Sequence, residues 1–339
     1  MASTELHETA RAIVADHKGI LAADESTGTI KKRFESIGVE STEENRRFYR
    51  QLLFATPGME DAIGGVILYD ETIRQSADDG TPFPELLASK GSIPGIKVDT
   101  GAHDLAGFPG EKVTEGLDGL RPRLEEYASL GARFAKWRAV ITIGEGIPTD
   151  ACLRANAHAL ARYASLCQEA GIVPIVEPEV LMAADNTLET CWEVTTRTLH
   201  QTFDALYELG IDLRSTLLKP NMVISGKGCP EQASSERIAE ATVDCFLGVV
   251  PAAVPGIVFL SGGQSEVEAT ENLNAINKLA GPWPLSFSYG RALQDEALKT
   301  WSGKAGNVAA AQKAYLHRVK CVSAAATGKY SKQMEVVAA

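Results

Sequence analysis

The sequence lacks the patterns that mark disulfide-rich, membrane-spanning and secreted proteins. Its six cysteines, at 152, 167, 191, 229, 245 and 321, form no CxxC pair and no dense framework, so we expect free thiols in a reducing cytosol. No apolar run is long enough to span a bilayer. The amino-terminal stretch carries acids and has no apolar core, which predicts no secretory or transit peptide. Together these absences favour a cytoplasmic protein.

Patterns that indicate a bound cofactor are also scarce. None of the six histidines stands in HxxxH or HExxH spacing, and only His103 lies near an expected strand end. No GxGxxG follows the first expected strand, which gives a dinucleotide-binding fold little support. The sequence therefore predicts chemistry without a metal or another cofactor.

Positive charge is in the minority, with 33 Lys and Arg against 44 Asp and Glu and a net charge of −11. This balance argues against a nucleic acid or an anionic membrane as a general partner. A phosphorylated substrate stays possible, but it requires a local cluster of Lys and Arg.

Short apolar runs alternate with helical patterns along the whole chain of 339 residues. Expected strands cover 19–24, 63–69, 93–99, 132–138, 172–179, 216–222, 256–263 and 284–290, and expected helices cover 4–16, 41–52, 119–130, 149–170, 188–208, 235–248, 264–279, 291–300 and 306–324. A capping box from Ser41 to Glu44 is expected to start the second of these helices.

Eight strands of this kind predict an α/β fold, the (β/α)8 TIM barrel. Near-continuous apolar strands are typical of a parallel sheet that is covered on both faces, and eight βα units fit a closed barrel. We expect a single domain over 1–339, in which 331–339 form a short mobile tail. An open doubly wound sheet is the alternative.

A lysine interrupts the sixth apolar run, Thr216 to Met222. Lys219 follows two leucines, and Pro220 removes a backbone donor directly after it. Lysine is rarely buried without a partner. An amine held there suits attack on a carbonyl, because burial and a nearby cation both favour its neutral form. A snorkelling lysine with its head in water is the alternative.

Charged residues also end several of the other strands. Lys97 with Asp99, Lys136 with Arg138, and Glu177 with Glu179 each share a face, since residues two apart in a strand point the same way, and Asp24 ends the first strand. Functional residues of barrel enzymes collect at the carboxyl ends of the strands. We therefore predict that these side chains meet in one pocket with Lys219.

Their chemistry suggests separate roles. Lys136 is the cation that favours a neutral Lys219, and Glu177 moves protons while a carbinolamine loses water. Glu179 is expected to hold the lysines in place. Asp24 is the acid left to remove a hydroxyl proton, although a turn or helix-capping role is the alternative for it.

Two glycine-containing strand ends predict a phosphate site. Ser261, Gly262 and Gly263 close the seventh strand, and Gly290 with Arg291 closes the eighth. Barrels often bind phosphate at these strands through backbone N–H groups and a helix N-terminus, and Arg291 supplies a fork for phosphate oxygens. Lys31, Lys32 and Arg33 are either a second phosphate site or a solvated helix face.

The motifs around these residues resemble those of class I fructose-bisphosphate aldolases, the lysine Schiff-base type. The resemblance covers almost the whole chain and is carried by LAADESTGTIKKR, FAKWR, GIVPIVEPE, TLLKPNM, FLSGGQS and FSYGRALQ, among others. It implies reversible cleavage of fructose 1,6-bisphosphate to dihydroxyacetone phosphate and glyceraldehyde 3-phosphate, in glycolysis and gluconeogenesis. It also implies a metal-independent homotetramer.

The resemblance implies roles for individual residues as well. Lys219 would form the imine, Glu177 would be the acid/base, Lys136 and Glu179 would be their partners, and Asp24 would be the base for bond cleavage. The implied substrate-binding residues toward one phosphate are Ser26, Arg33 and Lys97, with Arg46 a further candidate near the substrate. Those at the other phosphate are Ser261, Gly262, Gly263 and Arg291, and Gly290 and Arg138 complete the set.

Two other functions stay open from the sequence. One is a related barrel enzyme that forms the same imine with another sugar phosphate, such as sedoheptulose bisphosphate. The other is a non-catalytic scaffold, which should have lost at least one of Lys219, Glu177 and Asp24. Many aldolases end in a tail with a terminal tyrosine, whereas the last tyrosine here is Tyr330. The preference for fructose 1,6-bisphosphate over fructose 1-phosphate therefore stays open.

Overall fold

The computed structural model describes residues 4–16, 18–279 and 281–336. Eight parallel strands close into a barrel in the order β1-β10-β9-β8-β7-β6-β3-β2. These strands are β1 Gly19–Ala22, β2 Ile63–Leu68, β3 Ile93–Lys97, β6 Phe134–Ile141, β7 Val173–Val180, β8 Leu217–Leu218, β9 Ile257–Phe259 and β10 Leu285–Tyr289. Because β1 pairs with both β2 and β10, the sheet has no free edge, which confirms the predicted TIM barrel and excludes the open sheet.

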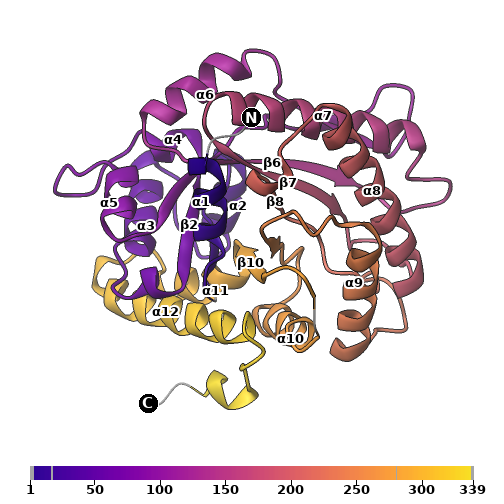
Figure 1. Ribbon diagram of the computed structural model, residues 1–339. Helices are drawn as coiled ribbons and strands as arrows, with labels where there is room; N and C mark the ends of the chain where they lie inside the picture. The colour runs from indigo at the N-terminus through magenta and orange to yellow at the C-terminus, as the bar shows by residue number, and fades with distance from the viewer. Residues whose placement is uncertain (1–3, 17, 280, 337–339) are drawn as a thin grey trace.

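Except for the first two, the helices surround the barrel in chain order, so that the colour runs once around the ring in Figure 1. They are α1 Thr4–Ile13, α2 Thr27–Glu35, α3 Glu43–Phe54, α4 Asp70–Ile73, α5 Phe83–Ser89, α6 Leu120–Ser129, α7 Asp150–Glu169, α8 Leu188–Glu208, α9 Ser235–Val249, α10 Glu266–Ile276, α11 Arg291–Trp301 and α12 Val308–Ala325. Within the described ranges, no helix has the combination of length and apolar composition that a bilayer crossing requires.

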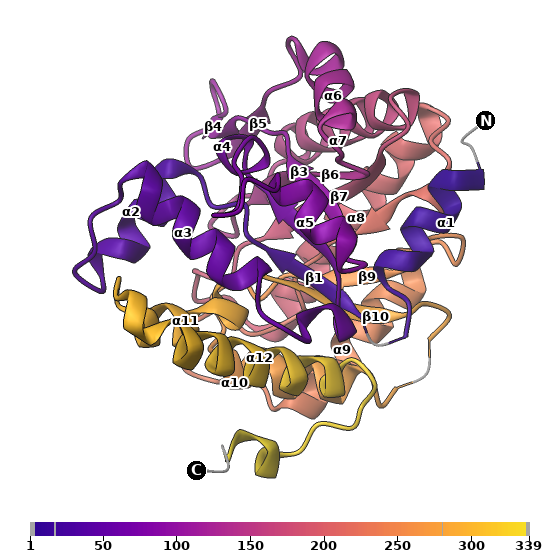
Figure 2. The same ribbon diagram turned by 90° about the vertical axis from the view of Figure 1, so that its left-hand side faces the viewer.

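Helix α1 lies across the amino-terminal end of the barrel. Its apolar residues Leu6, Ala10 and Ile13 are buried in one cluster with strand residues that include Ile20 and Phe134. Figure 2 shows α1 and α2 at opposite ends of the barrel, before and after β1. Since α1 covers one end, only the carboxyl ends of the strands are left to form a site.

Several local expectations were wrong. The expected capping box is absent because α3 begins one residue later: Thr42 is the N-cap, and its side chain accepts a hydrogen bond from Asn45 N at 3.1 Å. The strand expected over 216–222 is only Leu217–Leu218. Helices α4 and α5 and an antiparallel hairpin, β4 Gly101–Asp104 with β5 Lys112–Glu115, were not expected, and α2 was foreseen only as the alternative of a helix face at Lys31, Lys32 and Arg33.

The carboxyl-terminal segment packs beside α12. A short 3-10 helix, η4 Lys332–Glu335, follows the turn after α12, and Glu335 binds Arg318 of that helix with oxygen-to-nitrogen distances of 2.8 and 2.6 Å. Residues 337–339 of the expected tail lie outside the described residues. All six cysteines are free thiols with buried side chains, as the sequence predicted.

Candidate active site

The residues that face the barrel axis change from apolar to charged toward the carboxyl ends of neighbouring strands. The lower apolar layer includes Phe134, Ile175 and Leu217, which pack with α1. Two residues further along the same strands stand Lys136, Glu177 and Lys219. Because side chains two apart share a face, the apolar layer excludes water from below and the charged residues meet directly above it.

A cavity of about 800 Å³ opens above this charged layer. It brings together all but one of the residues predicted from the sequence. They are Asp24, Ser26, Arg33, Lys97, Lys136, Arg138, Glu177, Glu179, Lys219, Ser261, Gly262, Gly263, Gly290 and Arg291. Arg46 is missing from the described lining, and its guanidinium instead binds Glu71 with two contacts of 2.7 and 2.6 Å.

The centre of the cavity is a row of four charges that alternate in sign. Lys219 Nζ lies 3.1 Å from Glu177 Oε1, and Lys136 Nζ lies 3.2 Å from Glu177 Oε2 and 2.8 Å from Asp24 Oδ2. The Lys219 side chain is 5% exposed. The snorkelling alternative is therefore wrong, because the amine is buried and paired rather than in water.

Each carboxyl in the row is held ionised by its cationic neighbours. Burial alone would raise the pKa of Asp24, but Lys136 and Lys219 outweigh burial and lower it. The pKa of Glu177 is lowered for the same reasons. Burial would lower the pKa of Lys136, but Asp24 and Glu177 raise it. Lys136 is thus a permanent cation beside the amine of Lys219.

Main-chain contacts fix Lys219 although β8 is short. Lys219 N donates to Val176 O at 2.8 Å, and Leu260 N donates to Pro220 O at 3.1 Å, so both neighbouring strands still hold the segment. The buried Asn221 side chain accepts from Val180 N at 3.0 Å. This role of Asn221 was not predicted, although an amide directly after a Lys-Pro pair in an apolar run indicates a buried hydrogen-bonding side chain.

Two further carboxylates flank the row, and one of them, Glu179, differs from expectation. Glu179 contacts Arg138, and no ion pair between Glu179 and either central lysine is present among the described residues. Asp99 Oδ1 lies 2.7 Å from Lys97 Nζ, and this carboxylate is almost fully buried. Glu179 therefore orients the guanidinium group of Arg138 at the cavity wall, and not Lys136 or Lys219.

The capping alternative for Asp24 is also wrong. Ser26 is the N-cap of α2 and accepts from Thr29 N at 3.4 Å, whereas Asp24 reaches Lys136. In α2, Lys32 and Arg33 line the cavity, while Lys31 is exposed and pairs with Glu35 at 3.9 Å. One face of this helix is therefore a cationic wall and the other is solvated.

A further buried carboxylate, Glu25, was missed from the sequence. It lies 2.6 Å from Arg33 Nη1 and 2.8 Å from Arg50 Nη2. Gln294 Nε2 also donates to it at 3.2 Å. The only sequence feature that pointed to Glu25 was its position directly after Asp24. No pattern in the sequence reveals that Arg50, 25 residues away, is its partner.

The two glycine-containing strand ends lie against arginines. Gly262 and Gly263 have φ of +58° and +104°, a backbone conformation that side chains rarely adopt. A Cβ added to Gly263 would lie 3.4 Å from Arg291 Nη2, and one added to Gly290 would lie 3.6 Å from Arg33 Nη2. The glycines thus leave room for an anion between backbone N–H groups and two guanidinium groups.

The barrel and its site define a class of lyase in which a buried lysine forms an imine with a carbonyl substrate. Comparison with known proteins agrees with this class and narrows it. The profile of the family described as Glycolytic, fructose-bisphosphate aldolase class-I, matches residues 5–339. The chain belongs to the class I fructose-bisphosphate aldolase family.

Its relatives come from distant organisms. The chain is 61% identical over 332 residues to a probable fructose-bisphosphate aldolase class 1 of Xanthomonas campestris, covering 97% of this chain and 99% of that protein. It is 55% identical to the cytosolic fructose-bisphosphate aldolase 5 of Arabidopsis thaliana, covering 96% and 92%. Among solved structures, the aldolase of Plasmodium falciparum, crystallised with TRAP and a small-molecule inhibitor, has a TM-score of 0.95 and 50% identity, covering 96% and 95%.

Proposed function

We propose that this chain cleaves fructose 1,6-bisphosphate reversibly through a Schiff base on Lys219. The observation that carries the proposal is the buried row of Asp24, Lys136, Glu177 and Lys219, with contacts of 2.8 to 3.2 Å. The cationic wall of the same cavity suits a substrate with two phosphates.

Imine formation requires proton transfer between Lys219 and Glu177. Glu177 Oε1 takes a proton from the ammonium at 3.1 Å, and the neutral amine adds to the C2 carbonyl of the open-chain sugar. The protonated Glu177 then returns the proton to the carbinolamine hydroxyl, which leaves as water.

Cleavage of the carbon–carbon bond requires a base at the end of the row that lies opposite Lys219. Asp24 removes the proton of the C4 hydroxyl, the C3–C4 bond breaks, and its electron pair moves into the protonated imine. Glyceraldehyde 3-phosphate leaves, and an enamine stays on Lys219. Asp24 lies 2.8 Å from Lys136, which stabilises the carboxylate before the proton arrives.

The phosphates occupy the two ends of the cavity in this proposal. Ser261, Gly262, Gly263, Gly290 and Arg291 bind one phosphate, while Ser26, Lys97 and Arg33 bind the other, with Arg138 beside the sugar. Arg33 approaches Gly290 closely enough to contact either group. Arg46 lies in an ion pair with Glu71 and reaches the substrate only if that pair opens.

A turnover assay in the presence of a chelator tests the proposal. We expect the purified protein to cleave fructose 1,6-bisphosphate at an unchanged rate in excess EDTA, and Lys219→Met to lose at least a thousandfold in kcat. Lys278→Met, which removes an exposed lysine, is the matched control and should keep full activity. Loss of activity in EDTA, or an active Lys219→Met protein, would contradict it. Parallel rates with fructose 1-phosphate and sedoheptulose bisphosphate determine the preferred substrate.

We also propose that the protein is a cytoplasmic homotetramer. The family resemblance and the cytosolic Arabidopsis relative support this assignment. Sedimentation equilibrium should give four times the chain mass of 36.2 kDa, and a species of one chain mass at micromolar concentration would contradict it.

A further inference from the structure

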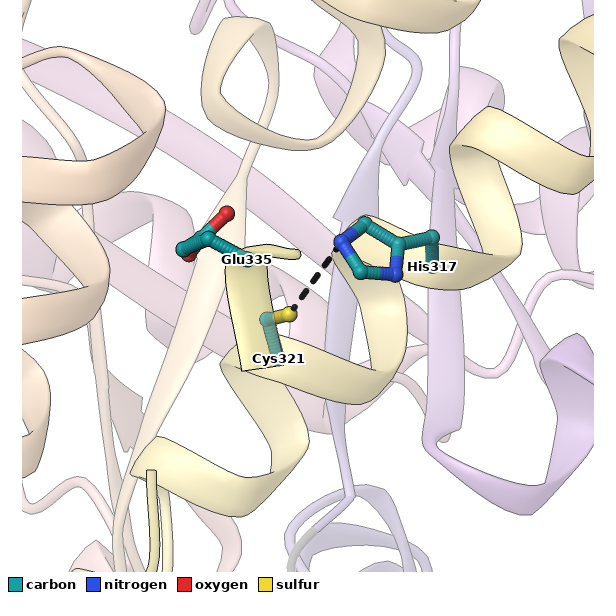
Figure 3. A group of neighbouring side chains, drawn as sticks. All are labelled: His317, Cys321 and Glu335. Carbon is teal, nitrogen blue, oxygen red and sulfur yellow. Dashed lines mark hydrogen bonds between the residues drawn. The ribbon is translucent and has the colours of Figure 1, made fainter. Parts of the chain in front are cut away.

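A second cluster of reactive side chains lies on the outside of the barrel, away from the catalytic cavity. His317 and Cys321 stand four residues apart on α12 and so share one face of that helix. Glu335 reaches the same place from η4 (Figure 3). None of the three lines the cavity that holds Lys219.

The spacing of these three side chains suits a metal ion. His317 Nε2 lies 3.8 Å from Cys321 Sγ, and one ligand atom from each of the three residues lies within 4.8 Å of the others. With metal-ligand bonds of about 2.0 Å to nitrogen and 2.3 Å to sulfur, a tetrahedral zinc ion separates the two ligands by about 3.5 Å. The helix therefore presents its two ligands at nearly the spacing that such an ion requires.

The charges around the cluster also suit a divalent cation. A thiolate and a carboxylate neutralise two positive charges, and imidazole is the third ligand type that zinc favours. Glu335 already binds Arg318, but Glu266 Oε2 lies 3.8 Å from Arg318 Nε and supplies a second counter-charge when Glu335 is shared. Tyr330 OH donates to Glu335 Oε1 at 2.8 Å, the kind of outer contact that orients a metal-ligating carboxylate.

Access to the cluster and a fourth ligand are both available. A surface hollow of about 230 Å³ is lined by His317 and Arg318, so an ion can reach the imidazole from solvent. The carbonyl oxygen of Met334, which belongs to η4, lies 3.7 Å from Cys321 Sγ. Either this oxygen or a water molecule can complete a tetrahedron.

We propose that His317, Cys321 and Glu335 bind a divalent transition-metal ion of the zinc class, which fastens the carboxyl-terminal segment to α12. The ion is structural and takes no part in the aldol reaction. The sequence does not reveal this site, because it contains neither a histidine pair nor a cysteine pair and because Glu335 comes to the cluster only through the turn after α12.

Titration of the metal-free, full-length protein with Zn²⁺ and Co²⁺ tests the proposal. We expect one equivalent of Zn²⁺ to bind, and a Co²⁺ complex with a thiolate-to-metal charge-transfer band. His317→Gln and Glu335→Gln should each weaken Zn²⁺ binding at least tenfold, and Cys321→Ser should also abolish the charge-transfer band. Zn²⁺ should also slow proteolysis of the segment after Tyr330 in the unaltered protein.

Matched controls separate this site from chance binding. His200→Gln removes an exposed histidine of α8, and Cys229→Ser removes another buried thiol, so both should bind Zn²⁺ normally. Glu335→Gln leaves α12 unchanged and reports on the site even if the buried Cys321 variant folds poorly. Equal Zn²⁺ affinity in the unaltered, His317→Gln and Glu335→Gln proteins, or a Co²⁺ complex without a thiolate band, would overturn the proposal.

Discussion

Buried charges, each paired with its opposite, are the main feature at the scale of single residues. Lys136 contacts both Asp24 and Glu177, and all three side chains are at most 13% exposed. Removing one partner of a buried ion pair leaves the other charge unpaired in a low dielectric, which costs about 3–5 kcal/mol. Catalytic arrangement and stability are therefore coupled at this site.

Lys136→Met should reduce both properties together. Without this cation, the two carboxylates lose their strongest stabilising neighbour, and their pKa values rise. We expect a loss of about 3–5 kcal/mol in the free energy of unfolding by urea and a decrease of at least about a hundredfold in kcat. Lys278→Met serves again as the exposed control. A variant as stable and active as the unaltered protein would mean that Lys136 is not the central counter-charge.

Glu25→Gln should reveal the coupling of stability to pH. Burial would raise the pKa of Glu25, but Arg33 and Arg50 hold it below its ordinary value. A carboxyl with a lowered folded-state pKa stabilises the fold above the unfolded pKa of about 4.3, and this contribution is lost as the pH falls through the folded pKa. We expect the variant to be about 3–5 kcal/mol less stable at neutral pH.

The test of this prediction is the difference in unfolding free energy between the two proteins as the pH is lowered from 7 to 3. The difference should shrink below about pH 4, because the unfolded-state carboxyl then binds a proton while native Glu25 is still ionised. A difference that stays constant over this range would show that Glu25 acts through packing rather than charge. Glu145→Gln, at an exposed loop position, is a control that should change stability little at any pH.

At the scale of secondary-structure elements, close packing inside the barrel controls which residues fit. Gly95 in β3 pairs with Phe134 in β6, and a Cβ added to Gly95 would lie 2.3 Å from the Phe134 ring. That ring is fully buried against α1 and its neighbours. The ring has no space to retreat, so β3 and β6 can pair only through a residue without a side chain.

Gly95→Ala should therefore destabilise the fold by about 1–3 kcal/mol through overpacking. Gly248→Ala in α9 is the matched control, because nothing lies within 4 Å of its added Cβ. The control should be neutral or stabilise by about 0.5–1 kcal/mol, since alanine loses less backbone entropy than glycine in a helix. Denaturant midpoints measure both changes, and equal stability of the two variants would contradict this account of the barrel interior.

The sequence predicted elements well where periodicity was strong and poorly where single contacts decide the structure. Helix α8, over 188–208, was placed with the bounds that the structure shows, because its apolar positions repeat over many turns. Helix α2 could not be assigned bounds from the sequence because it buries only Ile30 and Phe34 and is otherwise polar. The β4–β5 hairpin has largely exposed strands, so it lacks the apolar alternation that identifies a strand.

The sequence could predict which residues belong to the site, but not which of their side chains contact one another. Strand ends reveal which side chains face the axis, so the sequence located Lys219, Glu177 and Asp24 together. It could not show that Glu179 contacts Arg138, that Glu25 joins Arg33 to Arg50, or that Arg46 turns to Glu71. Those choices depend on side-chain length and on contacts between distant elements, which leave no periodic signal.

At the scale of the whole molecule, charge is separated between the surface and the cavity. The protein has a net charge of −11, yet the cavity lining includes the exposed cations Lys32, Arg291 and Lys299 at its mouth. A local positive field inside a negative protein attracts an anionic substrate over roughly a Debye length, about 10 Å at 0.1 M salt.

Substrate capture should therefore depend on ionic strength. We expect kcat/KM for fructose 1,6-bisphosphate to fall about three- to tenfold between roughly 0.02 and 0.3 M salt, while kcat changes little. Replacing Lys32 and Lys299 together by Gln should flatten this dependence. A kcat/KM that is independent of salt in the unaltered protein would show that the mouth of the cavity does not steer the substrate.

If the buried amine of Lys219 becomes covalently attached to the substrate, borohydride reduction will trap the adduct. The protein is reduced in the presence of fructose 1,6-bisphosphate or dihydroxyacetone phosphate, digested, and mapped by mass spectrometry. We expect one stoichiometric adduct on Lys219, absent from Lys219→Met and present in Lys278→Met. An adduct on another lysine, or full cleavage activity with no adduct, would contradict it.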